Sequence, residues 1–91
     1  MKIYIAGKIN GDENYLEKFK NSENHCIVNG WETINPASFP RLGWKESMRR
    51  DLKLLNDCQA IYMINDWKDS KGATLEHWYA KRYELIIIYE N

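Results

Sequence analysis

Four strand-like runs alternate with three segments of helical periodicity, and this alternation limits the folds open to the chain. The runs cover residues 2–6, 31–35, 59–64 and 85–89. The predicted helices cover residues 13–29, 44–57 and 71–83. Strands that alternate with helices pair in parallel through right-handed crossovers. We therefore expect an α/β protein, a small Rossmann-like three-layer sandwich with a four-stranded parallel sheet of order 2-1-3-4. The last run is apolar throughout, which is typical of strands covered on both faces.

Composition favours one globular domain over residues 1–91 and argues against some partners. Hydrophobic residues make up 44% of the 91 positions, which is enough for a modest core. Thirteen basic residues balance thirteen acidic ones, so the chain lacks the excess of positive charge that duplex nucleic acid requires. Four tryptophans and six tyrosines are many for a core of this size, and we expect some at the interface of a homodimer or larger homo-oligomer.

Cysteine and histidine spacing predicts no metal site, and we expect no cofactor. Cys26 and Cys58 have no CxxC neighbour, and the two histidines do not complete a zinc pattern with them. The chain opens on a predicted strand rather than a secretory signal, and no window approaches a membrane span. We expect a cytoplasmic protein with no membrane partner.

The segment from Asp66 to Glu76 joins the third predicted strand to the third predicted helix. Open α/β sheets bind ligands at the carboxyl ends of their strands, beside helix N-termini. Ser70 is a natural N-cap for this helix. Together with the amides of Gly72 and Ala73 it is equally suited to hold a phosphate.

Asp51 is the first carboxylate with two interpretations. It lies three residues after Met48 and four before Leu55, on or beside the apolar stripe of its helix. Charged residues are seldom buried unless they are paired or functional. Asp51 is therefore either a chemical group or a residue at the edge of the stripe, paired with a neighbouring Arg49, Arg50 or lysine.

Glu76 is the second such carboxylate. It lies between Ala73 and Ala80, on a face of small residues that suits close packing against a sheet. Leu75 and Tyr79 define a competing apolar face of the same helix. The pattern by itself favours an exposed glutamate that interacts with the helix dipole.

Several motifs of the chain occur together in a known family. They are Tyr4-Ile5-Ala6-Gly7, Asn35-Pro36-Ala37, Met48-Arg49-Arg50-Asp51-Leu52, Cys58-Gln59-Ala60-Ile61-Tyr62 and the segment from Trp67 to Glu76. Over nearly its whole length the chain resembles the DUF4406 family, a small branch of the nucleoside 2-deoxyribosyltransferase-like superfamily. The resemblance implies a flavodoxin-like sheet.

The same resemblance implies a chemistry. Members of the superfamily cleave or transfer the N-glycosidic bond of nucleosides and nucleotides. Glu76 matches their glutamate nucleophile, and Asp51 matches the aspartate that assists it. Ser70 stands six residues before the glutamate, where relatives that hydrolyse nucleoside 5′-monophosphates also carry serine. Superfamily sites are often shared between subunits.

The implied function is that of a hydrolase or deoxyribosyltransferase-like enzyme for nucleoside 5′-monophosphates. The implied substrate-binding residues are Tyr4, Ala6, Gly7, Trp67, Ser70, Gly72 and Ala73, with Trp67 or Trp44 near the base. The alternatives are a non-catalytic binding protein for a nucleotide or a nucleotide-derived signal, and an interaction protein that keeps only the fold.

Overall fold

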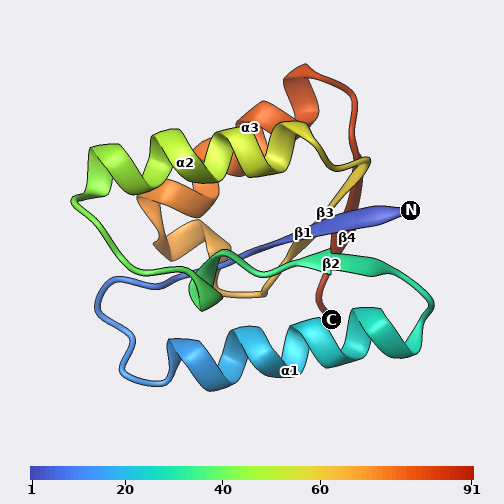
Figure 1. Ribbon diagram of the computed structural model, residues 1–91, viewed down its shortest axis with the longest axis horizontal. Helices are drawn as coiled ribbons and strands as arrows, with labels where there is room; N and C mark the ends of the chain where they lie inside the picture. Colours follow the sequence, from blue (N-terminus) through green and yellow to red (C-terminus); the bar gives the residue numbers. More distant parts are fainter.

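The computed structural model describes residues 1–91, and its centre is a four-stranded parallel sheet (Figure 1). The strands are β1 (Lys2–Ala6), β2 (Glu32–Ile34), β3 (Ala60–Met63) and β4 (Ile86–Tyr89). Their order is β2-β1-β3-β4, and every neighbouring pair is parallel. The predicted fold class and strand order are therefore confirmed.

Helices cover both faces of this sheet (Figure 1). The helices are α1 (Tyr15–Val28), α2 (Trp44–Asn56) and α3 (Lys71–Arg82). Helix α1 lies on one face, and α2 and α3 lie together on the other. Two 3₁₀ turns, η1 (Pro36–Ser38) and η2 (Trp67–Asp69), lead from β2 and β3 toward the next helix. Gly30 follows α1 with a φ of 87°, the left-handed conformation that glycine adopts at helix ends.

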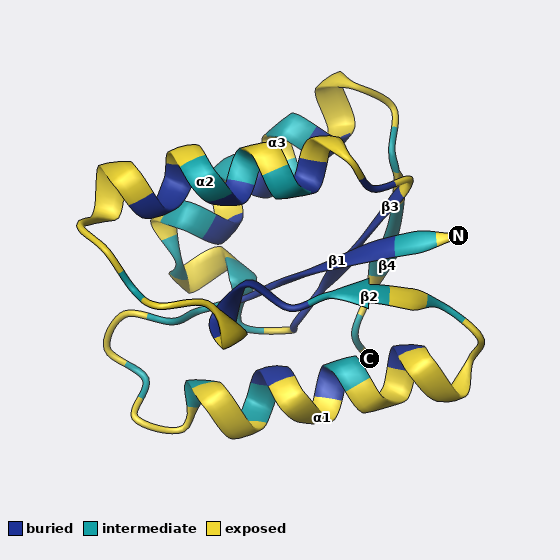
Figure 2. Cartoon of the chain, viewed as in Figure 1, coloured by how far each residue is buried: buried dark blue, intermediate teal, exposed yellow.

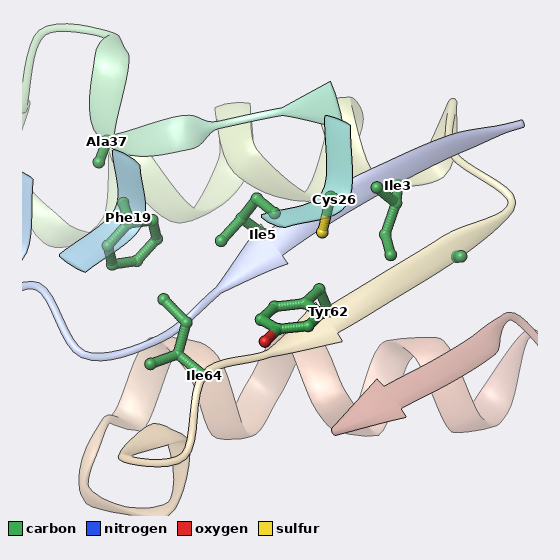
Figure 3. Close-up of a cluster of buried hydrophobic side chains, with 8 residues drawn as sticks. Ile3, Ile5, Phe19, Cys26, Ala37, Tyr62 and Ile64 are labelled. Atoms are coloured by element: carbon green, nitrogen blue, oxygen red, sulfur yellow. The ribbon is translucent and has the colours of Figure 1, made fainter. Parts of the chain in front are cut away.

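The core has two apolar layers because successive strand residues point to opposite faces. Ile3 and Ile5 of β1 and Tyr62 of β3 point toward Phe19 and Cys26 of α1 (Figure 3). The other layer, on the side of α2 and α3, is formed by Tyr4, Ala6, Leu55, Cys58, Ile61, Met63 and Ala80. Full burial of a large apolar side chain is worth about 1.5–3 kcal/mol, so both layers hold the sheet between its helices.

Strand β4 is less covered than its sequence predicts (Figure 2). Ile86 is 48% exposed and Tyr89 is 51% exposed. The expectation of coverage on both faces is wrong for this strand. Strand β4 lies at the edge of the sheet, and α1 packs over β1 and β2 instead. No helix of the protein combines the length and the apolar character that crossing a membrane requires.

Candidate functional site

A cleft of about 370 Å³ opens beside the carboxyl end of β1, between the first turns of α2 and α3. Both helices begin at the same end of the sheet (Figure 1). The volume falls within the range of small-molecule sites. Its place at the carboxyl ends of parallel strands is where open α/β sheets bind ligands. We therefore take this cleft as the candidate site.

Glu76 lies in the wall of the cleft and is buried, with only 5% of its surface exposed. The expectation of an exposed glutamate is wrong. Ala73 and Ala80 face the sheet, and their small side chains let α3 approach it closely. Glu76 lies between them on the same face and is carried inward. The Tyr4 hydroxyl, which comes from β1, donates a hydrogen bond to Glu76 Oε2.

Burial dominates the electrostatics of Glu76 and raises its pKa to about 8. The hydrogen bond from Tyr4 opposes this effect, the charge of Asp51 adds to it, and Arg41 opposes it. Burial also raises the pKa of the Tyr4 hydroxyl well above its ordinary value. Glu76 is consequently protonated for the most part at pH 7. Strongly shifted carboxyl groups in clefts are typical of functional sites.

Asp51 lies on α2 and is also buried, with 2% of its surface exposed. Arg50 Nε donates to Asp51 Oδ1 at 3.1 Å, and Arg41 Nη2 lies 3.6 Å from Oδ2. Burial raises the pKa of Asp51, while the two guanidinium groups lower it. The two interpretations of Asp51 are therefore compatible, because the residue is paired with Arg50 and also lines the cleft.

The first turn of α3 forms another part of the cleft wall. The Ala73 amide donates to Ser70 Oγ at 3.1 Å, so Ser70 is the N-cap. The amides of Lys71 and Gly72 have no hydrogen-bond partner within the chain. These two donors and the positive end of the helix dipole suit an anion.

Two glycines of the cleft also serve packing. A Cβ at Gly7 would lie 2.9 Å from Ile64 Cβ, too close for any larger residue without movement. A Cβ at Gly72 would lie 3.0 Å from Met48 Sδ, so this glycine lets α3 approach α2. Both glycines line the cleft as well.

Two of the implied substrate-binding residues lie outside the cleft. Ala6 is buried in the apolar layer beneath α3. Trp67 packs against the same layer, and its ring stacks on His77 at a centroid distance of 4.1 Å. The tryptophan that lines the cleft is Trp44, with Lys71 Nζ 4.6 Å from its ring centroid. The other implied residues, Tyr4, Gly7, Asp51, Ser70, Gly72, Ala73 and Glu76, all line the cleft.

Sequence reasoning missed Arg41 as a residue of the cleft. It stands in the irregular connection between β2 and α2, in a segment with two prolines and a glycine. A lone arginine in such a loop carries no periodic or motif signal. The structure brings it to Asp51 because this connection crosses the end of the sheet.

A charged cluster ties the loop after β1 to the loop after β3. Lys18 of α1 forms ion pairs with Asp12 and Asp66. Asp66 Oδ1 also accepts the backbone N–H of Lys8 at 3.1 Å. These contacts fix the loop that carries Asn10, a further residue of the cleft wall.

Comparisons with known proteins place the fold and the family. A solved structure described as 2-desoxiribosyltransferase from Leishmania mexicana matches with a TM-score of 0.75 and 17% sequence identity. The match covers 97% of this chain and 62% of that chain, so the present chain spans less than two thirds of that protein. At this identity the likeness shows a shared fold. The comparison with curated proteins gives no match. A family model described as a domain of unknown function, DUF4406, matches residues 1–89, and the chain therefore belongs to the DUF4406 family.

Proposed function

We propose that the protein cleaves the N-glycosidic bond of nucleoside 5′-monophosphates and either hydrolyses the sugar phosphate or transfers it to another base. The observation that carries this proposal is the pair of buried carboxyl groups, Glu76 and Asp51, in one cleft with the Tyr4 hydroxyl bonded to Glu76. The shared fold of the 2-desoxiribosyltransferase supports it.

The proposed reaction has two steps. In the first, a carboxylate oxygen of Glu76 bonds to the anomeric carbon, and the bond between that carbon and the base breaks with its electron pair on the base. Asp51, as a carboxylic acid, gives its proton to the departing base. In the second, water attacks the anomeric carbon, the bond to Glu76 breaks, and the proton of the water returns to Asp51. A second base in place of water gives transfer.

The remaining residues of the cleft position the substrate in this proposal. The Tyr4 hydroxyl orients the Glu76 carboxyl group through their hydrogen bond. Ser70 and the free amides at the start of α3 take the 5′-phosphate. Trp44 lies at the cleft and stacks on the base. Ala6 and Trp67 have no part in this proposal because they lie outside the cleft.

Substitution of Glu76 tests the proposal. The wild-type chain is incubated with deoxynucleoside 5′-monophosphates, and free base is measured by liquid chromatography. Glu76→Ala should lower base release by at least about 10³-fold, as expected for loss of a nucleophile. Glu46→Ala, which removes an exposed glutamate from α2, is the matched control and should retain full release. Equal release by Glu76→Ala and the wild type would remove the nucleophile assignment.

The pKa of Glu76 favours a second candidate function, that of a binding protein without turnover. A carboxyl group with a pKa of about 8 is mostly protonated at pH 7 and is then a poor nucleophile. Such a protein would bind nucleoside monophosphates through the same cleft. It would show an increase in melting temperature with ligand but release no base at any pH between 6 and 9.

A further inference from the structure

Arg41 reaches the cleft with most of its hydrogen-bonding capacity unused. Its side chain is 28% exposed. Its one hydrogen bond runs from Nη1 to the Pro36 carbonyl at 3.4 Å, and its distance of 3.6 Å to Asp51 exceeds hydrogen-bond reach. A guanidinium group has five N–H donors. Arg41 therefore has donors available for a ligand.

Asp51 does not need Arg41 as its partner. Arg50 donates from Nε to Asp51 at 3.1 Å and from Nη1 to the Pro40 carbonyl at 2.5 Å, which anchors it beside that carboxylate. Arg50 is not part of the cleft wall, whereas Arg41 is. Arg50 already supplies a hydrogen-bond donor to Asp51, so the donors of Arg41 are free for another partner.

Arg41 and the start of α3 enter the cleft from different connections of the chain. Arg41 comes from the connection after β2, on one side of β1, while α3 packs over β1, β3 and β4 on the other side. Tyr4 of β1 and Glu76 of α3 line the same cleft, joined by their hydrogen bond. A nucleotide with its anomeric carbon at Glu76 and its phosphate at the first turn of α3 leaves the donors of Arg41, in the wall of the same cleft, available to its base.

We propose that Arg41 binds the leaving base through a carbonyl oxygen, such as O2 of a pyrimidine. The inference rests on the proposed function and names its substrate class, nucleoside 5′-monophosphates whose base carries a carbonyl group. When the bond to the anomeric carbon breaks, the electron pair left on the base spreads onto that oxygen. The fixed positive charge of Arg41 stabilises it there until the proton arrives from Asp51.

Two ligands, one with a base and one without, show whether Arg41 contacts the base or the phosphate. Binding of dUMP and of 2-deoxyribose 5-phosphate, which lacks the base, is measured by calorimetry. Arg41→Ala should weaken dUMP binding by about 10–100-fold, the cost of a charge-assisted hydrogen bond, and leave the sugar phosphate unaffected. Arg49→Ala, which removes an exposed arginine of α2, is the matched control and should change neither affinity.

Three binding results would overturn the assignment. They are an equal loss for both ligands, a loss confined to the sugar phosphate, and a wild-type chain that binds neither ligand. Arg41→Lys keeps the positive charge but loses the planar fork, so it should give an intermediate affinity for dUMP. A melting curve for each variant shows that it is folded.

Rates of base release give a further test, because a purely structural role of Arg41 would affect all bases equally. Arg41→Ala should lower the rate of uracil release more than the rate of 5-fluorouracil release. 5-Fluorouracil is the better leaving group and needs less stabilisation. Equal losses for the two bases would contradict the inference. If the proposed function itself is wrong, the result is different: the wild-type chain releases no base. The comparison of dUMP with 2-deoxyribose 5-phosphate decides the role of Arg41 in that case as well.

Discussion

The two faces of the sheet bury very different side chains. Under α1 the buried layer is almost wholly apolar, with Ile3, Ile5 and Phe19 at its centre (Figure 3). On the other face, the layer beneath α2 and α3 adjoins two buried carboxyl groups, those of Asp51 and Glu76. One short strand, β1, serves both faces through alternate residues. Both faces contribute apolar burial, but the second also carries the free-energy cost of burying two ionisable groups.

The largest expected effect tests the apolar face. Ile3→Ala removes a fully buried side chain and should lower the free energy of unfolding by about 2–5 kcal/mol. Urea denaturation followed by circular dichroism measures the change. Val28→Ala on α1, where the side chain is 85% exposed, is the control and should have little effect. Equal losses for the two variants would mean that the layer under α1 is not the stabilising one.

The carboxyl face should respond in the opposite direction. Glu76→Gln keeps the shape of the side chain but removes its ionisation. The folded state raises the pKa of Glu76 from 4.5 to about 8, so it binds the proton more tightly than the unfolded chain does. The wild type therefore loses stability as the pH rises from about 4.5 to about 8.

Glu76→Gln should escape this loss. At pH 9 we expect it to be more stable than the wild type by about 1–3 kcal/mol, the cost of a poorly satisfied buried polar group. At pH 4 the two proteins should differ little. Thermal melts across this pH range measure the difference, with the exposed Glu46→Gln as control. A difference independent of pH would show that Glu76 is not the titrating group.

The same titration predicts the pH dependence of turnover. The proposed reaction needs Glu76 ionised and Asp51 protonated, so kcat/KM for base release should fall as the pH rises above about 8, where ionisation of Glu76 is nearly complete and Asp51 loses the proton that the base requires. Initial rates with dUMP between pH 5.5 and 9 measure this profile. A constant kcat/KM from pH 6 to 9 would contradict the assignment.

The smallest expected effect concerns charges that neither face buries. Asp66→Asn weakens the ion pair with Lys18, in which both side chains are partly exposed. Exposed pairs contribute about 0.2–1 kcal/mol, and salt screens them. The loss in melting temperature should therefore shrink as sodium chloride is added. Asp69→Asn, at an exposed position of η2, is the control. A loss that persists at high salt would place this ion pair with the buried charges.

Much of the architecture could be predicted because it depends on periodicity. Alternation of runs such as 2–6 and 59–64 with helical segments predicts a parallel sheet, and right-handed crossovers leave only a few strand orders, among which 2-1-3-4 was a guess that the structure confirms. The exposure of Ile86 could not be predicted, because an apolar strand has the same sequence at the edge of a sheet as at its centre. Which strand lies at the edge, and which helix covers it, depends on contacts between distant segments.

Some residues of the candidate site could be predicted from the sequence, and others could not. Family resemblance pointed to Glu76, whereas periodicity favoured its exposure, because Leu75 and Tyr79 are more hydrophobic than the alanines that face the sheet. Packing distance decided the orientation of the helix, and side-chain hydrophobicity alone did not indicate it. Arg41 was missed because its loop has no repeating geometry from which a neighbour can be inferred.

The bare backbone at Gly72 has a consequence for the two buried carboxyl groups. A single added methyl group would lie 3.0 Å from the sulfur of Met48, so this side chain or one of the two helices would have to shift. Asp51 lies on one of these helices and Glu76 on the other. The spacing of the two buried carboxyl groups thus depends on a close approach of α2 and α3 that a glycine permits.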